Sequence, residues 1–383
     1  IENIMENNNI TTKKRILVLN YEFPPLGGGA SPVSYEIADR LSKTGDFEVD
    51  VVTMGYKDLP KYQEINSNFR IYRVKCLRSK KEICHPWEQA TYLISAYFKC
   101  RKLLKKNKYD ICHCHFIIPT GVLAMRLKKE FGLEYIITAH GSDVPGYNTD
   151  RFKFLHKFTG PLLKKISKEA KNIISPSLYL KDLILKNISV LNKEKVIIIP
   201  NGIDVNKFTP KEKKKYIFSS GRLLARKGFQ YLIQAVSDKD ISYEVHIAGD
   251  GPMMAELKKL ADKSKTKIFF HGWLDSNGQE YKNLLERSSI YILASEKENA
   301  SIALLEAMSA GCAVITTNVS GCPETISDSG LLISPKNYED LKSKLDDLIN
   351  NQDKIVNLQK LALKRVTNIY DWSVVLKEYI KVL

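Results

Sequence analysis

The regular alternation of short apolar runs with helix-like segments constrains the fold of this chain most strongly. Residues 15–20 read Arg-Ile-Leu-Val-Leu-Asn, and residues 32–43 have the apolar spacing of a helix. The pattern predicts further strands at residues 49–53, 71–74, 111–115 and 135–138, with a basic helix near residues 91–106. Repeated strand–helix units of this kind predict a parallel sheet covered by helices.

The same pattern begins again after Pro200. It predicts strands at residues 216–219, 243–248, 267–270, 289–293, 313–316 and 330–333. Two successive halves of similar size, within 383 residues, predict an α/β protein with two Rossmann-like domains facing each other across a cleft. Polar segments near residues 190–210 place the boundary there, so we expect domains at residues 1–195 and 196–370.

Positive charge is concentrated in the first half of the chain. Residues 1–200 contain 33 Lys and Arg against 20 Asp and Glu, whereas the remainder contains 26 against 23. This asymmetry favours an anionic surface or polyanion as the partner of the first domain. The basic segments 92–108 and 151–171 also carry aromatic residues, which suits helices lying on anionic lipid. Helices that pack on a core and expose a lysine face would give the same pattern.

Nucleic acid is a partner that the net charge of +16 brings to mind, but we recognise no readout motif for it and do not expect it. No apolar run approaches the length needed to cross a bilayer, and residues 1–12 are polar. We therefore expect a cytoplasmic protein with seven reduced cysteines, or one held on the inner face of the cell membrane.

Cys112-His113-Cys114-His115 looks like a metal-binding cluster. It falls in an expected strand, where successive side chains point to opposite faces. The two cysteines would share one face and the two histidines the other, a poor start for tetrahedral zinc. We expect no metal site and no cofactor.

Two loops of the first half have the composition of ligand-binding turns. Residues 24–30 contain three consecutive glycines between the first strand and the first helix, where free N–H groups could meet an anion. A flexible loop would explain these glycines equally well. His140-Gly-Ser-Asp143 directly follows a strand, and strand ends are where open α/β sheets bind ligands. His140 could donate a hydrogen bond with Asp143 orienting it, although a lone histidine is more often structural.

In the second half, two cations and two carboxylates stand out. Arg222 and Lys227 flank a strand-to-helix turn, and a forked cation beside a point cation suits a diphosphate, although solvated surface charges would look the same. Residues 299–308 are helix-like, so the eight-residue offset from Glu298 to Glu306 would span roughly 12 Å along one helix face. Such carboxylates could bind both ends of a ligand with several hydroxyls.

Taken in order, these motifs resemble the retaining GT-B glycosyltransferases of family four, also called glycosyl transferase group 1. The ordered set covers nearly the whole chain: the glycine loop, residues 140–143, Ile199-Pro-Asn-Gly-Ile-Asp204, Gly221-Arg222, Lys227-Gly228, Ala248-Gly-Asp-Gly-Pro252, His271-Gly272-Trp273 and Glu298-x7-Glu306. Two departures concern the sugar end of the pocket. Glu298-Asn-Ala-Ser301 stands where relatives often have Glu-Gly-Phe-Gly, and Ser320-Gly321 stands where they often have Gly-Gly.

The resemblance implies a UDP- or GDP-linked sugar donor held mainly by the second domain, a glycan or lipid-linked acceptor held by the first, and no required metal. It implies a C-terminal helix, residues 371–383, that crosses back to the first domain. Donor contacts would come from Gly28, Gly29, Arg222, Lys227, Gly272, Trp273, Glu298, Ala300, Ser301, Ile302 and Glu306. The catalytic residues would be His140, Glu298, Arg222 and Lys227, and the acceptor side would include His115 and Asp143.

Within that set, the resemblance implies that Arg222 and Lys227 bind the diphosphate. It implies that Glu306 binds the ribose and that Glu298 binds the transferred sugar. Breaking a sugar–phosphate bond places negative charge on the leaving diphosphate, which fixed cations stabilise. The expected function is a retaining hexosyltransferase of cell-surface polysaccharide, lipopolysaccharide or glycolipid synthesis. A nucleotide-sugar epimerase, a phosphorylase of the same fold and a nucleic-acid-binding module are the alternatives.

Overall fold

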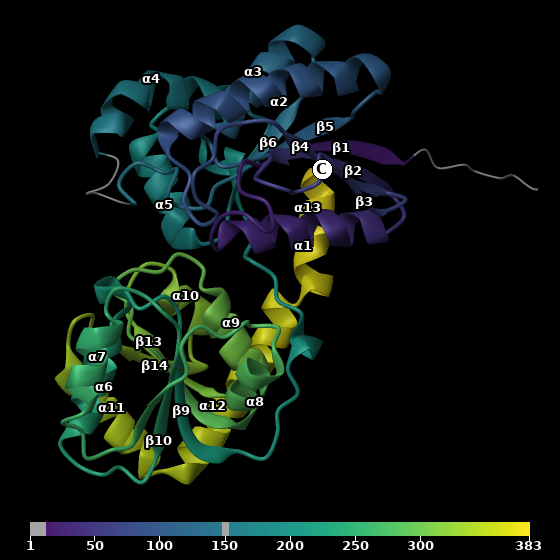
Figure 1. Cartoon of the computed structure of the whole chain (residues 1–383). Helices are drawn as coiled ribbons and strands as arrows, with labels where there is room; N and C mark the ends of the chain where they lie inside the picture. The colour runs from purple at the N-terminus through teal and green to yellow at the C-terminus, as the bar shows by residue number, and fades with distance from the viewer. Residues whose placement is uncertain (1–12, 148–152) are drawn as a thin grey trace, which may run out of the picture. The chain divides into compact units, whose positions relative to one another are not determined.

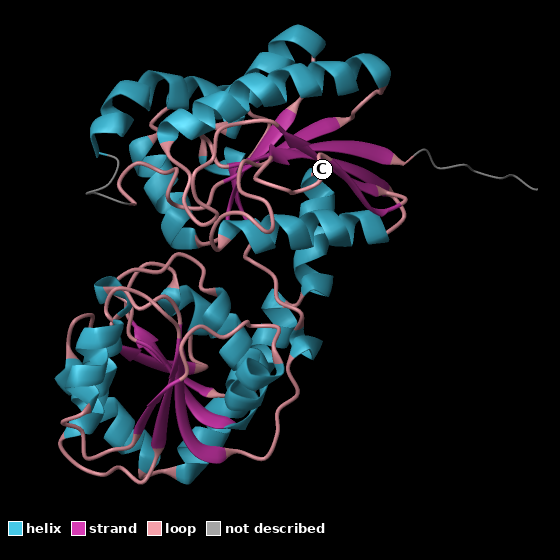
Figure 2. Ribbon diagram, viewed as in Figure 1, coloured by secondary structure: helices cyan, strands magenta, loops and turns pink. Residues whose placement is uncertain are grey.

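The computed structural model describes residues 13–147 and 153–383, and the chain forms two compact units (Figures 1 and 2). The first unit contains Ile1–Ser175, Lys181–Ile198 and Glu378–Leu383, and the second contains Pro176–Leu180 and Ile199–Lys377. Each unit is a layered α/β structure with helices on both faces of its sheet. The expectation of two Rossmann-like α/β domains is confirmed.

The first unit is built on an eight-stranded sheet with the order β3-β4-β2-β1-β5-β6-β7-β8. All neighbouring strands are parallel except β3, which pairs with β4 in the antiparallel direction. The strands are β1 (Lys14–Leu19), β2 (Phe47–Met54), β3 (Tyr62–Asn66), β4 (Phe69–Val74), β5 (Ile111–His115), β6 (Tyr135–Thr138), β7 (Ile173–Ser175) and β8 (Val196–Ile198). The sequence pattern indicated five of these and missed β3, β7 and β8.

Five helices connect the strands: α1 (Ala30–Lys43), α2 (Pro86–Lys106), α3 (Thr120–Phe131), α4 (Lys153–Glu169) and α5 (Leu178–Asn187). In Figure 1, α2 and α3 lie on one side of the sheet and α1 lies on the other. Helix α2 begins five residues before the expected start because Pro86 suits the first helical position and Glu88 accepts a 2.7 Å hydrogen bond from the His85 amide.

The second unit has a six-stranded, fully parallel sheet with the order β11-β10-β9-β12-β13-β14. Its strands are β9 (Lys214–Ser220), β10 (Glu244–Ala248), β11 (Ile268–Phe270), β12 (Ser288–Leu293), β13 (Ala313–Thr317) and β14 (Gly330–Ile333). Its helices are α6 (Phe229–Ser237), α7 (Met254–Ala261), α8 (Gln279–Arg287), α9 (Ile302–Ser309), α10 (Cys322–Ile326), α11 (Tyr338–Ile349) and α12 (Gln352–Arg365).

Two apolar cores sandwich this second sheet. Ile290 and Ile292 of β12 contribute to one core, whereas Tyr291 and Leu293 contribute to the other. Strands buried on both faces carry continuous apolar runs, which is why the sequence showed them clearly.

Each sheet has one position where the order of its strands reverses. In the first unit β1 lies between β2 and β5, and in the second β9 lies between β10 and β12. The carboxyl ends of the strands beside such a switch point are where open α/β sheets bind ligands. The candidate residues follow these strands.

The last helix, α13 (Trp372–Val382), belongs to both units, because Glu378–Leu383 belongs to the first unit and the residues before it to the second. Among the described helices, none combines the length and apolar character needed to cross a membrane.

Candidate active site

Lys227 and Glu298 form an ion pair at the carboxyl edge of the second sheet. Lys227 ends a short 3-10 turn (Ala225–Lys227) after β9, and Glu298 follows β12, on the other side of the switch point. The Lys227 Nζ contacts Glu298 Oε1, and their side chains are only 19% and 13% exposed. An ammonium group has three donors, so Lys227 can hold Glu298 and still bind an anionic oxygen.

Gly228 explains how the turn reaches this position. It has a φ of +75°, and a Cβ atom there would lie 2.0 Å from the carbonyl oxygen of Ala294. Only glycine allows the backbone after β9 to pack so closely on the end of β12. Next to it, the Glu296 amide donates a 2.8 Å hydrogen bond to the Arg226 carbonyl and ties the two loops together.

Glu298 does not lie on a helix, so the prediction of a helix over residues 299–308 is wrong at its start. Helix α9 begins at Ile302, with Ser301 as its N-cap. The carbonyl of Glu298 accepts from the Gly321 amide at 3.0 Å, and that of Ala300 accepts from Asn201 Nδ2 at 3.1 Å. Because these carbonyls are used elsewhere, the chain enters α9 as a loop, and the spacing argument for the two glutamates does not apply.

Glu306, in the second turn of α9, is held from two sides. Lys207 Nζ lies 2.7 Å from Oε1, and the Tyr281 hydroxyl donates a 2.9 Å hydrogen bond to Oε2. Burial, and then the carboxylate of Glu306, raise the pKa of Tyr281 well above its usual value, so its hydroxyl keeps its proton. The side chain of Glu306 is 7% exposed, and its remaining lone pairs can accept from hydroxyl groups. Sequence reasoning missed both Lys207 and Tyr281.

Arg222 is exposed and has no charged partner among the described residues. It follows Gly221, whose carbonyl oxygen would lie 1.9 Å from a Cβ atom on Gly249. The two glycines therefore allow the loops after β9 and β10 to touch. This contact places a free guanidinium at the same edge of the sheet as Lys227.

Gly272 and Trp273 follow β11 at the same edge. Gly272 has a φ of +66°, its carbonyl accepts a 2.6 Å hydrogen bond from the Gly249 amide, and the indole of Trp273 is 69% exposed. The preceding His271 bonds to His246 at 3.0 Å. An exposed aromatic side chain on an ordered turn offers a flat surface to a ligand.

In the first unit, the glycine loop follows β1 and leads into α1, as expected. Gly28 and Gly29 are exposed, and no atom lies near the position of a Cβ on either. Glu22 accepts a 3.4 Å hydrogen bond from the Gly28 amide. A ligand can therefore approach this loop, although the Gly28 amide is already bonded to the carboxylate of Glu22.

His140 follows β6 and is half-buried. Its Nε2 lies 3.1 Å from Nδ1 of His115, which ends the neighbouring strand β5. Burial lowers the pKa of His140 to about 3, and burial together with His113 and His140 lowers that of His115 well below its usual value. Both rings are therefore neutral near pH 7.

Asp143 does not touch the ring of His140 but orders the loop around it. Its carboxylate accepts hydrogen bonds from the amide of Ile117 at 2.7 Å and from that of His140 at 3.0 Å. Burial raises the pKa of Asp143, and these backbone bonds oppose that shift. Asp143 is 6% exposed, so in this structure its carboxylate stabilises the loop conformation.

The alternation expected for Cys112-His113-Cys114-His115 is confirmed. The two sulfur atoms lie 3.8 Å apart on one face of β5, and the two imidazole rings lie 4.5 Å apart on the other. Among the described residues, no three His, Cys, Asp or Glu side chains cluster as metal ligands would.

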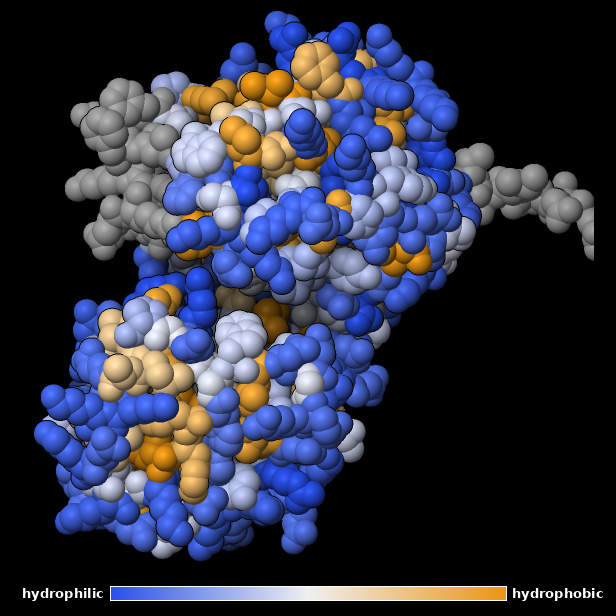
Figure 3. Space-filling view, viewed as in Figure 1, coloured by the Kyte–Doolittle hydropathy of each residue, from blue (hydrophilic) through white to orange (hydrophobic). Residues whose placement is uncertain are grey.

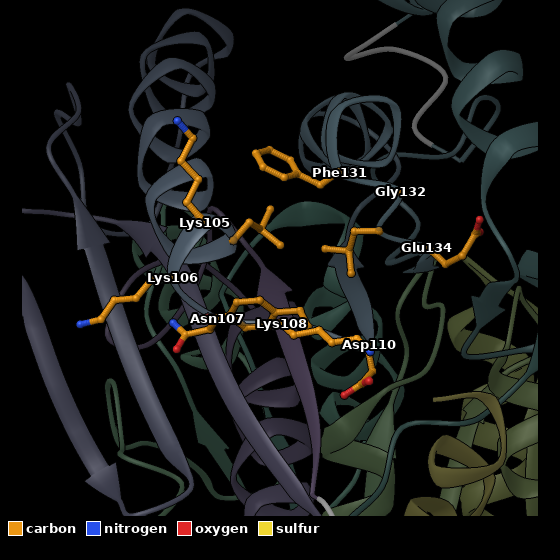
Figure 4. Close-up of a pocket in the computed structure, with 11 residues that line it drawn as sticks. Lys105, Lys106, Asn107, Lys108, Asp110, Phe131, Gly132 and Glu134 are labelled. Carbon is orange, nitrogen blue, oxygen red and sulfur yellow. The ribbon is translucent and has the colours of Figure 1, made fainter.

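A cavity of about 500 Å³ lies elsewhere, at the opposite edge of the first sheet (Figure 4). Its walls are the ends of α2 and α3 and the starts of β5 and β6, with Lys105, Lys106 and Asp110 around it. In Figure 4 the chains of Lys105 and Lys106 extend away from the space. It collects none of the candidate residues.

Two family models match the chain. Residues 27–207 match the model described as Glycosyltransferase Family 4, and residues 202–365 match Glycosyl transferases group 1. Together with the two Rossmann-like sheets, these matches show that the chain belongs to the GT-B glycosyltransferases of family four.

Individual relatives support the same family. An uncharacterized glycosyltransferase of Methanocaldococcus jannaschii is 29% identical, over 96% of this chain and 97% of its own. The UDP-Gal:alpha-D-GlcNAc-diphosphoundecaprenol alpha-1,3-galactosyltransferase of Escherichia coli is 26% identical over 91% of each chain. The solved structure of Anabaena HepE in complex with UDP-glucose has a TM-score of 0.71 at 15% identity, over 96% of this chain and 100% of that one, and so supports the fold.

Proposed function

We propose that this nucleotide-sugar-dependent glycosyltransferase is a retaining, metal-independent hexosyltransferase. The observation that carries the proposal is the arrangement at the switch point of the second sheet, where Lys227, Glu298 and Glu306 are each held in place by other protein groups. Two cations and two carboxylates at one sheet edge suit a ligand with a diphosphate and hydroxyl groups on either side of it.

In this proposal Arg222 and Lys227 bind the diphosphate. Departure of the diphosphate concentrates negative charge on its oxygens, and cations already in position stabilise that charge without reorganising. Glu306 accepts hydrogen bonds from the ribose hydroxyls, and Glu298, with the backbone of residues 300–302, binds the transferred sugar. Gly272 and Trp273 receive the base, Gly28 and Gly29 approach the diphosphate, and His140 contacts the sugar near the reacting carbon.

A thermal-shift screen of nucleoside diphosphates and their UDP- and GDP-linked sugars tests donor binding. At a hundredfold excess over Kd, a donor that binds only the folded second unit should raise the Tm of that unit, which has about 180 residues, by about 5 to 10 °C. Glu306→Ala and Lys227→Ala should abolish this rise, whereas Lys258→Ala, on the exposed side of α7, should retain it. A full rise in Glu306→Ala and Lys227→Ala would refute the site.

Product analysis then separates transfer from its alternatives. The proposed retaining transferase should release free sugar slowly when no acceptor is present and should keep the anomeric configuration of the donor in its product. Epimerised donor in the absence of acceptor, or turnover that depends on inorganic phosphate, would replace the transferase with an epimerase or a phosphorylase. Equal rates with and without a chelator are expected.

We further infer that the acceptor is a glycan or lipid-linked sugar presented at an anionic membrane. The Escherichia coli relative is named for a diphosphoundecaprenol-linked acceptor, and helix α2 has the surface such a location needs. Tyr92 and Cys100 of α2 are buried against the sheet, but Ile94 and Phe98 are each 63% exposed. Trp87, which is 54% exposed, lies two helical turns before Ile94 on the same face of α2.

Cations surround this apolar stripe. Lys102 and Lys105 continue it along α2, and Arg126 of α3 lies beside it, all exposed. Figure 3 shows apolar side chains gathered among hydrophilic ones over α2 and α3. An apolar stripe with a basic rim suits the interface of an anionic bilayer. In the second expected segment, 151–171, the side chains of residues 151–158 lie outside the part of the chain that the structure describes, so the proposed membrane surface is that of α2 alone.

Sedimentation with phosphatidylcholine vesicles, with and without phosphatidylglycerol, tests this location. Binding should require phosphatidylglycerol, weaken with salt, and fall at least about tenfold in Ile94→Gln/Phe98→Gln. Val190→Gln changes a side chain that is 45% exposed in the same unit and is the matched control. Equal binding by the double variant, or no binding by the unaltered protein, would refute the membrane site.

A further inference from the structure

Three histidine rings and one phenylalanine ring form a continuous cluster in the first unit. His113 and His115 lie on one face of β5, and the ring of His140 is nearly parallel to that of His115, with centroids 5.3 Å apart. Phe116 also contacts His140, with ring centroids 4.7 Å apart. His140 is therefore held by two adjacent residues, one on β5 and one directly after it.

Phe116 is in a backbone conformation that bulky residues rarely adopt, with a φ of +75°. Two hydrogen bonds maintain it: the Phe116 amide donates to the Thr138 carbonyl at 2.9 Å, and the Thr120 hydroxyl donates to the Phe116 carbonyl at 2.7 Å. Backbone strain that the surroundings enforce is commonly found at functional sites. Here it turns the phenyl ring against His140.

The hydrogen bond between His115 Nδ1 and His140 Nε2, 3.1 Å long, has two forms. Either His115 donates and carries its proton on Nδ1, or His140 donates and the proton of His115 sits on Nε2. His115 Nε2 is buried and has no hydrogen-bond partner among the described residues. The second form would bury an N–H group without an acceptor, and orphaned buried donors are rarer than orphaned acceptors.

We propose that His115 is a positioning residue that donates through Nδ1 to His140 Nε2 and thereby fixes His140 as the Nδ1–H tautomer. The other ring nitrogen of His140 then becomes a hydrogen-bond donor. Nδ1 of His140 has no partner among the described residues, and the side chain is half-buried, so this donor is the one left for a ligand.

This inference rests on the proposed function for the identity of the ligand, which is the sugar donor. A neutral imidazole with N–H at Nδ1 suits a hydroxyl or phosphate oxygen as acceptor. An imidazole protonated at Nε2 would instead present a bare lone pair at Nδ1 and would leave a phosphate oxygen without a donor.

Two-bond proton–nitrogen correlation spectra of the full chain with ¹⁵N-labelled histidine report each tautomer directly. His140→Gln and His115→Gln assign the two ring systems by loss of their signals. We expect His140 to be neutral and protonated at Nδ1, and His115 to be protonated at Nδ1 as well. An Nε2–H tautomer or an imidazolium at His140 would overturn the proposal. This readout needs neither donor nor turnover, so it can fail or succeed independently of the proposed function.

Substitutions of His115 supply the functional test. Asparagine places its amide nitrogen near the position of Nδ1 and can still donate to His140, whereas leucine cannot. We expect kcat/KM to fall roughly fivefold to tenfold in His115→Leu, with most of that loss regained in His115→Asn. The spectrum of His140 in His115→Leu should show a mixture of tautomers. Equal losses in both variants with an unchanged His140 spectrum would contradict a positioning role.

Discussion

The two carboxylates of the candidate site in the second unit, Glu298 and Glu306, are each held by a cation or hydroxyl of the same unit. Lys227 contacts Glu298, and Lys207 and Tyr281 share the two oxygens of Glu306. Such contacts fix the direction of a side chain before a ligand arrives, so less freedom is lost on binding. Lys207 should therefore strengthen ligand binding indirectly, because it orients the carboxylate of Glu306.

Lys207→Met should weaken donor binding roughly tenfold, because it removes a hydrogen bond between charged groups that orients Glu306. Lys211→Met is a matched control, since Lys211 Nζ lies 2.6 Å from Glu286 in the same segment of chain and does not contact Glu306. Titration calorimetry with the donor found in the thermal-shift screen measures both. Unchanged affinity in Lys207→Met, or an equal loss in Lys211→Met, would contradict this role.

Individual site residues could be predicted from the sequence only where they belong to a recognisable motif. Lys227, Glu298 and Glu306 were predictable because each lies in a short pattern after a strand. Lys207 and Tyr281 belong to no such pattern, and they reach Glu306 across 99 and 25 residues of sequence. The contact exists only because the sheet brings these segments together.

Among the elements, the turn between β9 and α6 packs closely on the end of β12 at Gly228. A Cβ atom on Gly228 would meet the carbonyl of Ala294, whereas Gly132, which ends α3 with a φ of +71°, has open space around it. Both positions have a conformation that disfavours side chains. Of the two, only Gly228 would add a steric clash, with the backbone directly after β12.

Gly132→Ala should therefore lower the free energy of unfolding by about 1 kcal/mol, and Gly228→Ala by several times as much. Urea denaturation followed by circular dichroism measures both values. Gly228→Ala should also lose donor binding, because the turn carries Lys227. Similar destabilisation by the two substitutions would show that the close approach to Ala294 contributes little.

The elements that the sequence missed share a physical explanation. β7 and β8 have three residues each, too few for a pattern, and the edge strand β3 alternates between half-buried and exposed residues. The start of α9 was misplaced because hydrogen bonds from Gly321 and Asn201 override the local helical preference. Strands buried on both faces were predictable because their apolar runs are continuous.

For the whole molecule, the buried histidines imply sensitivity to acid. Burial lowers the pKa of His113 and His140 to about 3, and that of His246 to about 4. In the unfolded chain each histidine binds its proton near its ordinary pKa of about 6.5. Protonation therefore favours unfolding, so this stability is complete above pH about 6.5 and is lost progressively toward pH about 3.

Urea midpoints should accordingly fall as the pH drops from about 7 to about 5, where most carboxylates are still ionised. Each fully buried histidine contributes a slope of about 1.4 kcal/mol per pH unit. His113→Gln should flatten the dependence, because glutamine keeps an amide near Thr138 and has no proton to gain. An unchanged slope in His113→Gln would remove His113 from the explanation.

The division of α13 has a consequence for how the molecule is made. The first unit is completed by Glu378–Leu383, and Tyr379 of that segment packs 6.0 Å from the ring of His113. These residues are translated roughly 180 positions after the last strand of the first sheet. At a ribosomal speed of about 5–20 residues per second, the nascent amino-terminal half must wait on the order of 10–40 s with its histidine face uncovered. The fold of the first half is thus finished only once synthesis of the second is over.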